Sequence, residues 1–146
     1  MIIYHGDGNL IHSKMQSLVC TVNLVGAMGK GIALTLSKRY PGLIDFYRDE
    51  IRSDNLVGGN ISVFRATNHT QIILLPTKVH WRNDSPYDLV FKSLEVLRDT
   101  YRDYDINSIA TPVVGCGNGN LDRNIIIPAM YYYLDDIDIP VEIYEN

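Results

Sequence analysis

Cysteine is scarce in this sequence, in which Cys20 and Cys116 are the only two among 146 residues. Both lie in apolar or glycine-rich surroundings, and no further ligands stand at the spacing that a structural zinc ion requires. A disulfide framework and a zinc site are therefore disfavoured. Because a chain of this length can bury one hydrophobic core without such staples, we expect a single domain over residues 1–146, with no metal and no cofactor.

Long apolar runs are also missing. No stretch approaches the roughly 18 residues that a membrane span needs, and the opening MIIYHGDGN lacks the basic segment and apolar core of a secretory signal. We therefore expect a cytoplasmic protein. Positive charge is in the minority, since 13 basic and 17 acidic residues give a net charge of -4. This balance argues against broad affinity for a nucleic-acid backbone, so any nucleic acid must be held through a local feature.

Short apolar runs alternate with helical patterns along the chain. They predict six strands, at residues 2–5, 18–22, 61–66, 72–76, 109–114 and 141–144. Most of these strands are too apolar for a sheet with one wet face. Apolar residues three and four apart predict helices between them, near residues 32–40, 44–51, 90–104 and 124–134. Strands interleaved with helices favour a three-layer α/β/α sandwich around a mostly parallel mixed sheet of about six strands.

The third of these helices has a clear start signal. Ser85 is predicted as its N-cap, Pro86 as its first helical residue, and Asp88 stands three positions past the cap.

Two glycine-rich segments follow predicted strands and lead into helices. They are VNLVGAMGKGIAL after the second strand and VVGCGNGNLD after the fifth. Such loops let the backbone approach a ligand and present free N–H groups at a helix start, where the dipole favours anions. One such loop could be a simple turn, whereas two at one sheet edge suggest a polyphosphate ligand. Neither segment has the P-loop or dinucleotide pattern, which disfavours a nucleoside triphosphatase or a dehydrogenase.

A lysine, Lys78, stands at the end of the predicted fourth strand in LLPTKVHWRNDSPYD. A lone lysine after a strand is usually solvated, so its neighbours decide how it is interpreted. Trp81 could stack a base and Arg82 could meet a phosphate. Alternatively, Trp81 packs over the sheet edge and Arg82 pairs with Asp84. His80 could carry a proton, although a hydrogen-bonded structural histidine is commoner.

Taken together, four segments resemble the macrodomain family, the ADP-ribose-binding fold: YHGDGNLI, TVNLVGAMGKGIALTLSKRYPG, LLPTKVHWRNDSPYDLVFKSLEVL and TPVVGCGNGNLD. The nearest resemblance is to the macrodomain of DarG antitoxins, which removes ADP-ribose from DNA bases. It implies a hydrolase that binds ADP-ribose and acts on ADP-ribosylated single-stranded DNA through a local contact. Whether a toxin counterpart exists stays open. Three alternatives stay open: an ADP-ribose 1″-phosphate phosphatase, a protein de-ADP-ribosylase and a noncatalytic reader of ADP-ribose.

The resemblance implies roles for particular residues. Lys78 matches the lysine that related glycohydrolases require, either to attack the anomeric carbon of the distal ribose or to assist opening of the sugar. Asp7 would accept a hydrogen bond from the adenine amino group, and Asn23 would lie near the distal ribose; by chemistry alone both are ordinary turn residues. The other implied binding residues are Gly8, Asn9, Gly29, Lys30, Gly31, Ile32, Thr77, His80, Trp81, Gly115, Cys116, Gly117, Asn118, Gly119 and Asn120.

The sequence departs from the family pattern at three positions. Gly8 replaces the usual aliphatic residue after GD, and Arg123 follows LD where the antitoxins have tryptophan. Gly119 stands where the related terminal ADP-ribose glycohydrolases place a catalytic aspartate. This disfavours a lysine-plus-aspartate mechanism and agrees with the DNA-directed branch. Asp122 either substitutes for that acid or caps the last helix. The further region of full antitoxins does not follow, so a stand-alone hydrolase and a fragment are both open.

Overall fold

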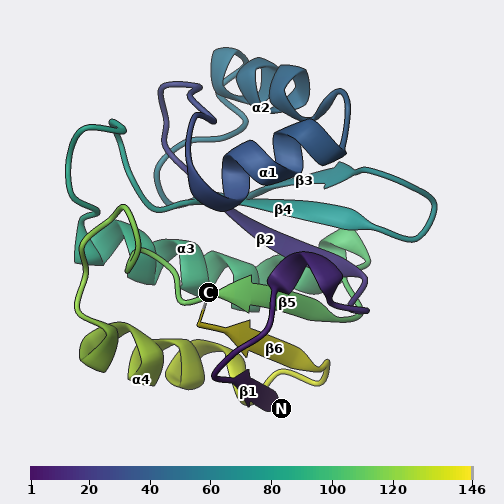
Figure 1. The fold of residues 1–146 in the computed structure, drawn as a ribbon, viewed down its shortest axis with the longest axis vertical. Helices are drawn as coiled ribbons and strands as arrows, with labels where there is room; N and C mark the ends of the chain where they lie inside the picture. The colour runs from purple at the N-terminus through teal and green to yellow at the C-terminus, as the bar shows by residue number, and fades with distance from the viewer. Residues whose placement is uncertain (146) are drawn as a thin grey trace.

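A six-stranded sheet with helices on both faces forms the framework of the protein (Figure 1). The computed structural model describes residues 1–145. The order of strands across the sheet is β1-β6-β5-β2-β4-β3. All neighbours are parallel except β3 and β4, which are antiparallel. The strands are β1 (Ile2–His5), β2 (Ser17–Val22), β3 (Ser62–Arg65), β4 (Gln71–Pro76), β5 (Ile109–Pro112) and β6 (Val141–Tyr144).

The helices form the two outer layers. Helices α1 (Gly31–Arg39) and α2 (Leu43–Arg52) lie on one face of the sheet, and α3 (Tyr87–Thr100) and α4 (Arg123–Leu134) lie on the other (Figure 1). Two short 3₁₀ turns, η1 (Leu10–His12) and η2 (Tyr101–Tyr104), complete the set. The three-layer sandwich and the mostly parallel mixed sheet are thus as the sequence predicts.

Strands β2 and β4 are buried on both faces, which explains their almost continuous apolar sequences. Successive side chains of a strand point to opposite faces. Accordingly, Leu18 and Cys20 pack in the core under α1 and α2, whereas Val19 packs in the core under α3 and α4. Burial raises the pKa of Cys20 to about 12, so this thiol is an inert core group.

The predicted start of α3 is wrong. Pro86 is the N-cap and Ser85 caps nothing. Instead, the Ser85 N–H donates to the Gly119 carbonyl oxygen at 3.0 Å, and its buried hydroxyl has no hydrogen-bond partner. Ser85 is therefore committed to a contact between loops that are distant in sequence. The far end of α3 also differs from the single helix predicted over residues 90–104, because α3 ends at Thr100 and the chain continues as η2. Both kinds of helix place residues three apart on one side, so the apolar spacing does not distinguish them.

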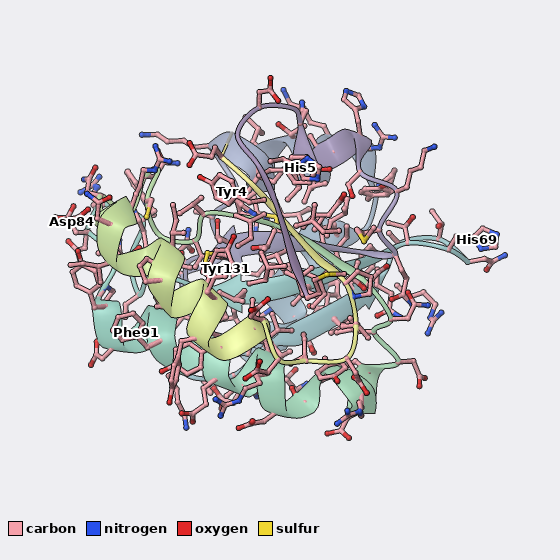
Figure 2. The ribbon with its side chains drawn as sticks, turned by 90° about the horizontal axis from the view of Figure 1, so that it is seen from below. Tyr4, His5, His69, Asp84, Phe91 and Tyr131 are labelled. Carbon is pink, nitrogen blue, oxygen red and sulfur yellow. The ribbon has the colours of Figure 1, made fainter. Side chains whose placement is uncertain are left out.

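The carboxyl ends of β2, β4 and β5 come together at one edge of the sheet. The opposite edge carries the β3–β4 turn, and Figure 2 shows His69 in this turn and Asp84, which follows β4, at opposite ends of the molecule. Strand β5 ends at Pro112, two residues earlier than predicted, so Val113 and Val114 belong to the connection at the carboxyl edge. Among residues 1–145, no helix is long and apolar enough to cross a membrane.

Candidate functional site

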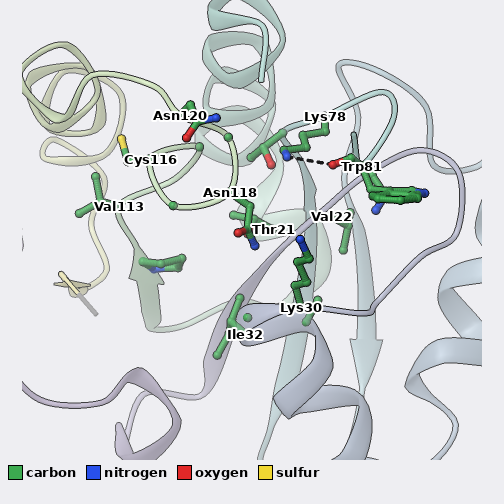
Figure 3. A pocket seen from close by; sticks show the side chains of 18 of the residues that line it. Thr21, Val22, Lys30, Ile32, Lys78, Trp81, Val113, Cys116, Asn118 and Asn120 are labelled. Atoms are coloured by element: carbon green, nitrogen blue, oxygen red, sulfur yellow. Dashed lines mark hydrogen bonds between the residues drawn. The ribbon is translucent and has the colours of Figure 1, made fainter. Parts of the chain in front are cut away.

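A cleft of about 820 Å³ opens at the carboxyl ends of β2, β4 and β5 (Figure 3). Its size is that of a small-molecule site, and its place is where open α/β sheets bind ligands. Fourteen of the binding and catalytic residues predicted from sequence line it: Asn23, Gly29, Lys30, Gly31, Ile32, Thr77, Lys78, Trp81, Gly115, Cys116, Gly117, Asn118, Gly119 and Asn120.

Four predicted residues are not among those that line the cleft. Asp7 is exposed, and Asn9 accepts a hydrogen bond from the Ile11 N–H as the cap of η1. Gly8 has a φ of +96°, a conformation that residues with a side chain rarely adopt. Leu10, which follows Asn9, does line the cleft, so this turn borders it. The adenine roles of Asp7, Gly8 and Asn9 remain predictions.

His80 is the fourth predicted residue that is not among those lining the cleft. Its Nδ1 accepts a hydrogen bond from the Arg82 N–H at 3.1 Å, and its ring stacks on Trp81 with 5.5 Å between centroids. This geometry favours the structural interpretation of His80, as a support for the segment after β4.

Lys78 lies in the cleft at the end of β4, and its side chain is mostly covered. The residue is 9% exposed, and Nζ donates to the Trp81 carbonyl oxygen at 3.2 Å (Figure 3). None of the ion pairs formed within residues 1–145 includes Lys78. A cation in such a place is costly unless something neutralises it. An anionic ligand in the cleft would supply the missing charge.

The first glycine-rich loop, residues 23–31, is held in shape by Asn23. The Asn23 side chain donates to the Ala27 carbonyl oxygen at 2.8 Å and accepts from the N–H groups of Val25 and Ala27. The hydroxyl of the fully buried Tyr47 donates to the Asn23 carbonyl oxygen at 2.6 Å and lies 2.8 Å from its Oδ1. Burial raises the pKa of Tyr47 above its usual value, which keeps this hydroxyl a donor. Asn23 thus shapes the loop and also lines the cleft.

The second glycine-rich loop, residues 115–121, is closed by a backbone hydrogen bond of 3.0 Å from the Leu121 N–H to the Gly115 carbonyl oxygen. Gly119 has no room for a side chain, because a Cβ there would lie 2.3 Å from both the Gly115 carbonyl oxygen and Ser85 Oγ. An aspartate cannot occupy this place without moving the loop. Asp122 accepts from the Asn124 N–H at 2.8 Å as the N-cap of α4, so of the two alternatives left open by the sequence the structure shows the capping one.

The two glycine-rich loops approach each other across the cleft. A Cβ at Gly31, whose φ is +58°, would lie 3.6 Å from the side-chain nitrogen Nδ2 of Asn118. Figure 3 shows the side chains of Lys30 and Asn118 extending into the space between the loops. Both loops lead into the N-terminus of a helix, α1 or α4, a place that favours anions.

The cleft is positively charged although the chain as a whole is acidic. Four basic and two acidic side chains line it: Lys30, Lys78, Arg82, Arg123, Asp84 and Glu145. Arg123 is ion-paired with Glu145, so its charge is largely neutralised within the protein. The other basic groups leave an excess of positive charge that favours an anionic ligand.

Trp81 and Arg82 lie at the rim beside Lys78. Trp81 is 45% exposed, which does not fit the alternative of packing over the sheet edge. The Arg82 guanidinium lies over the indole, 4.7 Å from the ring centroid. Asp84, the alternative partner of Arg82, instead accepts a hydrogen bond from Asn120 Nδ2 at 2.8 Å.

Cys116 also lines the cleft but is a poor candidate for a nucleophile. Burial, with a smaller contribution from the charge of Asp122, raises the pKa of Cys116 to about 11. Its thiol is therefore protonated at neutral pH, and nucleophilic chemistry requires the thiolate. No cluster of three or more histidine, cysteine, aspartate or glutamate side chains in residues 1–145 is placed to hold a metal ion.

Sequence reasoning missed several cleft residues of two kinds. The ends of β2 and β5 contribute one kind, and the rule that ligands bind beyond carboxyl strand ends could have found them. The other kind lies either inside the quoted segments, as Ala27, Ala33 and Asp84 do, or in segments distant in sequence, for which no local signal exists. The missed residues are Leu10, Thr21, Val22, Ala27, Ala33, Asp84, Pro112, Val113, Arg123 and Glu145.

The fold and the cleft define an α/β/α protein with a positively charged cleft at the carboxyl ends of its central strands, and comparison with known proteins gives the family. The family model described as Macro domain matches residues 19–130, so the chain belongs to the Macro domain family. The resemblance seen in the sequence is thereby confirmed. The macrodomain of Mycobacterium tuberculosis DarG superposes with a TM-score of 0.92 at 34% identity, covering 99% of this chain and 97% of that one.

Two curated relatives are longer proteins. A DNA ADP-ribosyl transferase-DNA ADP-ribosyl glycohydrolase fusion protein of Thermosipho africanus is 33% identical over 94% of this chain and 40% of its own length. The DNA ADP-ribosyl glycohydrolase of M. tuberculosis is 34% identical over 94% of this chain and 41% of its own length. The chain thus spans about two-fifths of these relatives. A structure of T. africanus DarTG in complex with ADP-ribose matches with a TM-score of 0.90, over 94% of this chain and 39% of that one.

Proposed function

We propose that this chain is a glycohydrolase that binds ADP-ribose and removes it from modified DNA bases, acting in the cytoplasm. The observation that carries the proposal is Lys78, a covered cation without an acidic partner, in a positively charged cleft. The match to proteins named DNA ADP-ribosyl glycohydrolase supports the choice of substrate. The fusion of a relative to a DNA ADP-ribosyl transferase supports a transferase as the class of counterpart.

In the proposed complex the diphosphate lies between the two glycine-rich loops. The backbone N–H groups of the loops and the Lys30 side chain stabilise the negative charge of the diphosphate. The adenine extends toward the turn that contains Asp7 and Leu10, and the distal ribose lies beside Lys78. This order uses the cleft from the β1 side to the β4 side and brings the glycosidic bond to the covered amine.

Cleavage breaks the bond between the anomeric carbon of the distal ribose and a base nitrogen. The bonding electrons leave with the base, which takes up a proton, and positive charge develops on the sugar. Lys78 either attacks the anomeric carbon, giving an intermediate that water hydrolyses, or assists opening of the sugar. Water finally supplies a hydroxyl to the anomeric carbon and a proton to the products. Gly119 supplies no side-chain carboxylate to take part in this reaction, and the crowding around it leaves no room for one.

The DNA part of the substrate is proposed to contact Trp81 and Arg82. Their place at the rim next to Lys78 supports this contact, because the base leaves the sugar at that end of the cleft. An aromatic ring and a guanidinium recognise bases and phosphates of single strands without requiring a basic protein overall. A net charge of -4 is therefore compatible with a DNA substrate.

The test compares three substrates under the same conditions: ADP-ribosylated single-stranded DNA, ADP-ribosylated protein and ADP-ribose 1″-phosphate. We expect release of ADP-ribose from the DNA, with a kcat/KM well above that for the other two, measured by chromatography of the products. Preferred turnover of the phosphate ester or of the protein would replace the proposal by a phosphatase or a protein hydrolase. Binding of free ADP-ribose with no turnover of any substrate would identify a reader.

Replacing Trp81 with alanine tests the DNA contact. The Trp81 carbonyl oxygen that holds Lys78 belongs to the backbone and is kept in the variant. We expect KM for an ADP-ribosylated oligonucleotide to rise about 10-fold, the usual worth of one base stacked on an aromatic ring. The rate with an ADP-ribosylated nucleoside should stay near wild type, and Trp81→Phe should keep most of the affinity. Equal losses with the oligonucleotide and the nucleoside would contradict a DNA contact.

A further inference from the structure

The segment that carries Lys78 is a loop fixed at both of its ends. Residues 77–86, called the lysine loop below, contain no helix or strand, and their middle is exposed. At one end the Val79 carbonyl oxygen accepts from the Leu24 N–H at 3.0 Å. At the other end the Ser85 N–H donates to the second glycine-rich loop at 3.0 Å. The loop thus spans the distance between the two glycine-rich loops.

One side-chain hydrogen bond accompanies the second of these attachments. Asn120 Nδ2 donates to Asp84 Oδ1 at 2.8 Å, and both residues line the cleft. Within residues 1–145 it is the only side-chain hydrogen bond between the lysine loop and the second glycine-rich loop. Asn120 has a φ of +60°, a conformation that asparagine and aspartate tolerate better than most residues. The contact therefore depends on a residue suited to this turn.

The position of the lysine loop determines where the Lys78 amine points. Its hydrogen-bond acceptor, the Trp81 carbonyl oxygen, belongs to the same loop, between Lys78 and Asp84. We propose that Asp84 and Asn120 are positioning residues for catalysis: their hydrogen bond holds the lysine loop against the second glycine-rich loop, so that the Trp81 carbonyl oxygen directs Lys78 Nζ. The effect on turnover rests on the function proposed above, whereas the effect on the loop does not.

An exchange of the two side chains tests the pair. Asn120→Asp places a second carboxylate against Asp84, and the like charges repel. Asp84→Asn leaves a carbonyl oxygen that can still accept from Asn120, so it should be mild. The double variant Asp84→Asn/Asn120→Asp restores an amide–carboxylate hydrogen bond with the roles reversed. If the side chains of residues 84 and 120 are hydrogen-bonded, the double variant should recover the turnover that Asn120→Asp loses.

Two readouts are needed. With ADP-ribosylated single-stranded DNA we expect kcat of Asn120→Asp to fall about 10- to 100-fold, the range expected when a catalytic group is displaced by about 1 Å. The double variant should return kcat to within about threefold of wild type. Trp81, the only tryptophan in the sequence, reports on the loop without any substrate. Its fluorescence should be quenched more strongly by acrylamide in Asn120→Asp and return to the wild-type value in the double variant.

The outcomes separate the two proposals. Quenching that rises and then reverts supports the hydrogen-bonded pair even if no DNA substrate is cleaved, in which case the proposed function fails alone. Quenching unchanged in Asn120→Asp, or a double variant no better than Asn120→Asp, overturns the pair. Loss of turnover in Asp84→Asn with unchanged quenching also overturns it, because the carboxylate would then act in the reaction itself.

Discussion

Lys78→Ala is expected to lower kcat/KM for ADP-ribosylated DNA by at least about 100-fold, because the variant lacks the group that would act at the anomeric carbon. Affinity for free ADP-ribose should fall much less than turnover, since the two glycine-rich loops that would hold the diphosphate are separate from β4. The fold should also tolerate the change. Lys78 is in no ion pair of the described chain, so its removal leaves no buried carboxylate without a partner. Initial rates, calorimetric titration with ADP-ribose and thermal unfolding measure these three quantities.

Lys14→Ala is the matched control, because Lys14 is exposed and does not line the cleft. It should leave both turnover and affinity unchanged. Lys78→Arg separates the two chemical roles of the lysine. A guanidinium keeps the positive charge but is not a nucleophile at neutral pH, so substantial activity in this variant favours electrostatic assistance over attack. If Lys78→Ala turns over DNA as fast as wild type, the lysine has no part in the reaction and the mechanism proposed above is wrong.

The sequence located the site well where the signals were local. A lysine that follows an apolar strand is expected at the carboxyl edge of a parallel sheet, and so are two glycine-rich segments that each follow a strand. The structure places Lys78 and both loops around one cleft for this reason. Likewise, Asp122 precedes an apolar helical pattern and is the N-cap of α4.

Ser85 shows why other predictions failed. Serine followed by proline and, three positions on, by an acid is a sound local signal for a helix start. In this protein, however, the Ser85 N–H is used by the Gly119 carbonyl oxygen, 34 positions further along the chain. Arg123 with Glu145 and Asp84 with Asn120 are contacts of the same kind. Such pairs form only when the completed fold brings distant loops together, so no pattern of neighbouring residues indicates them.

Gly119→Ala is expected to cost about 1–3 kcal/mol of unfolding free energy, the usual penalty for forcing extra atoms into a filled space. The two atoms that a Cβ would meet are the Gly115 carbonyl oxygen and Ser85 Oγ, so the methyl group must push the second glycine-rich loop away from the lysine loop. ADP-ribose affinity should therefore fall as well, because the loop's N–H groups leave their positions. Urea unfolding and calorimetric titration measure the two losses.

Gly117→Ala is the control for stability, since a Cβ at Gly117 meets nothing within 4 Å and its φ is not in the left-handed region. Its unfolding free energy should be near that of wild type. Gly119→Asp makes the stronger test, because it adds the acid that related terminal ADP-ribose glycohydrolases have at this position. We expect a less stable protein with lower turnover of every substrate, since the carboxylate can enter only by displacing the Ser85 contact. The contrary outcome is a Gly119→Asp variant that is as stable as Gly117→Ala and gains activity on ADP-ribosylated protein. It would show that the loop can move to accept a side chain, and that glycine at this position determines the substrate and is not required for packing.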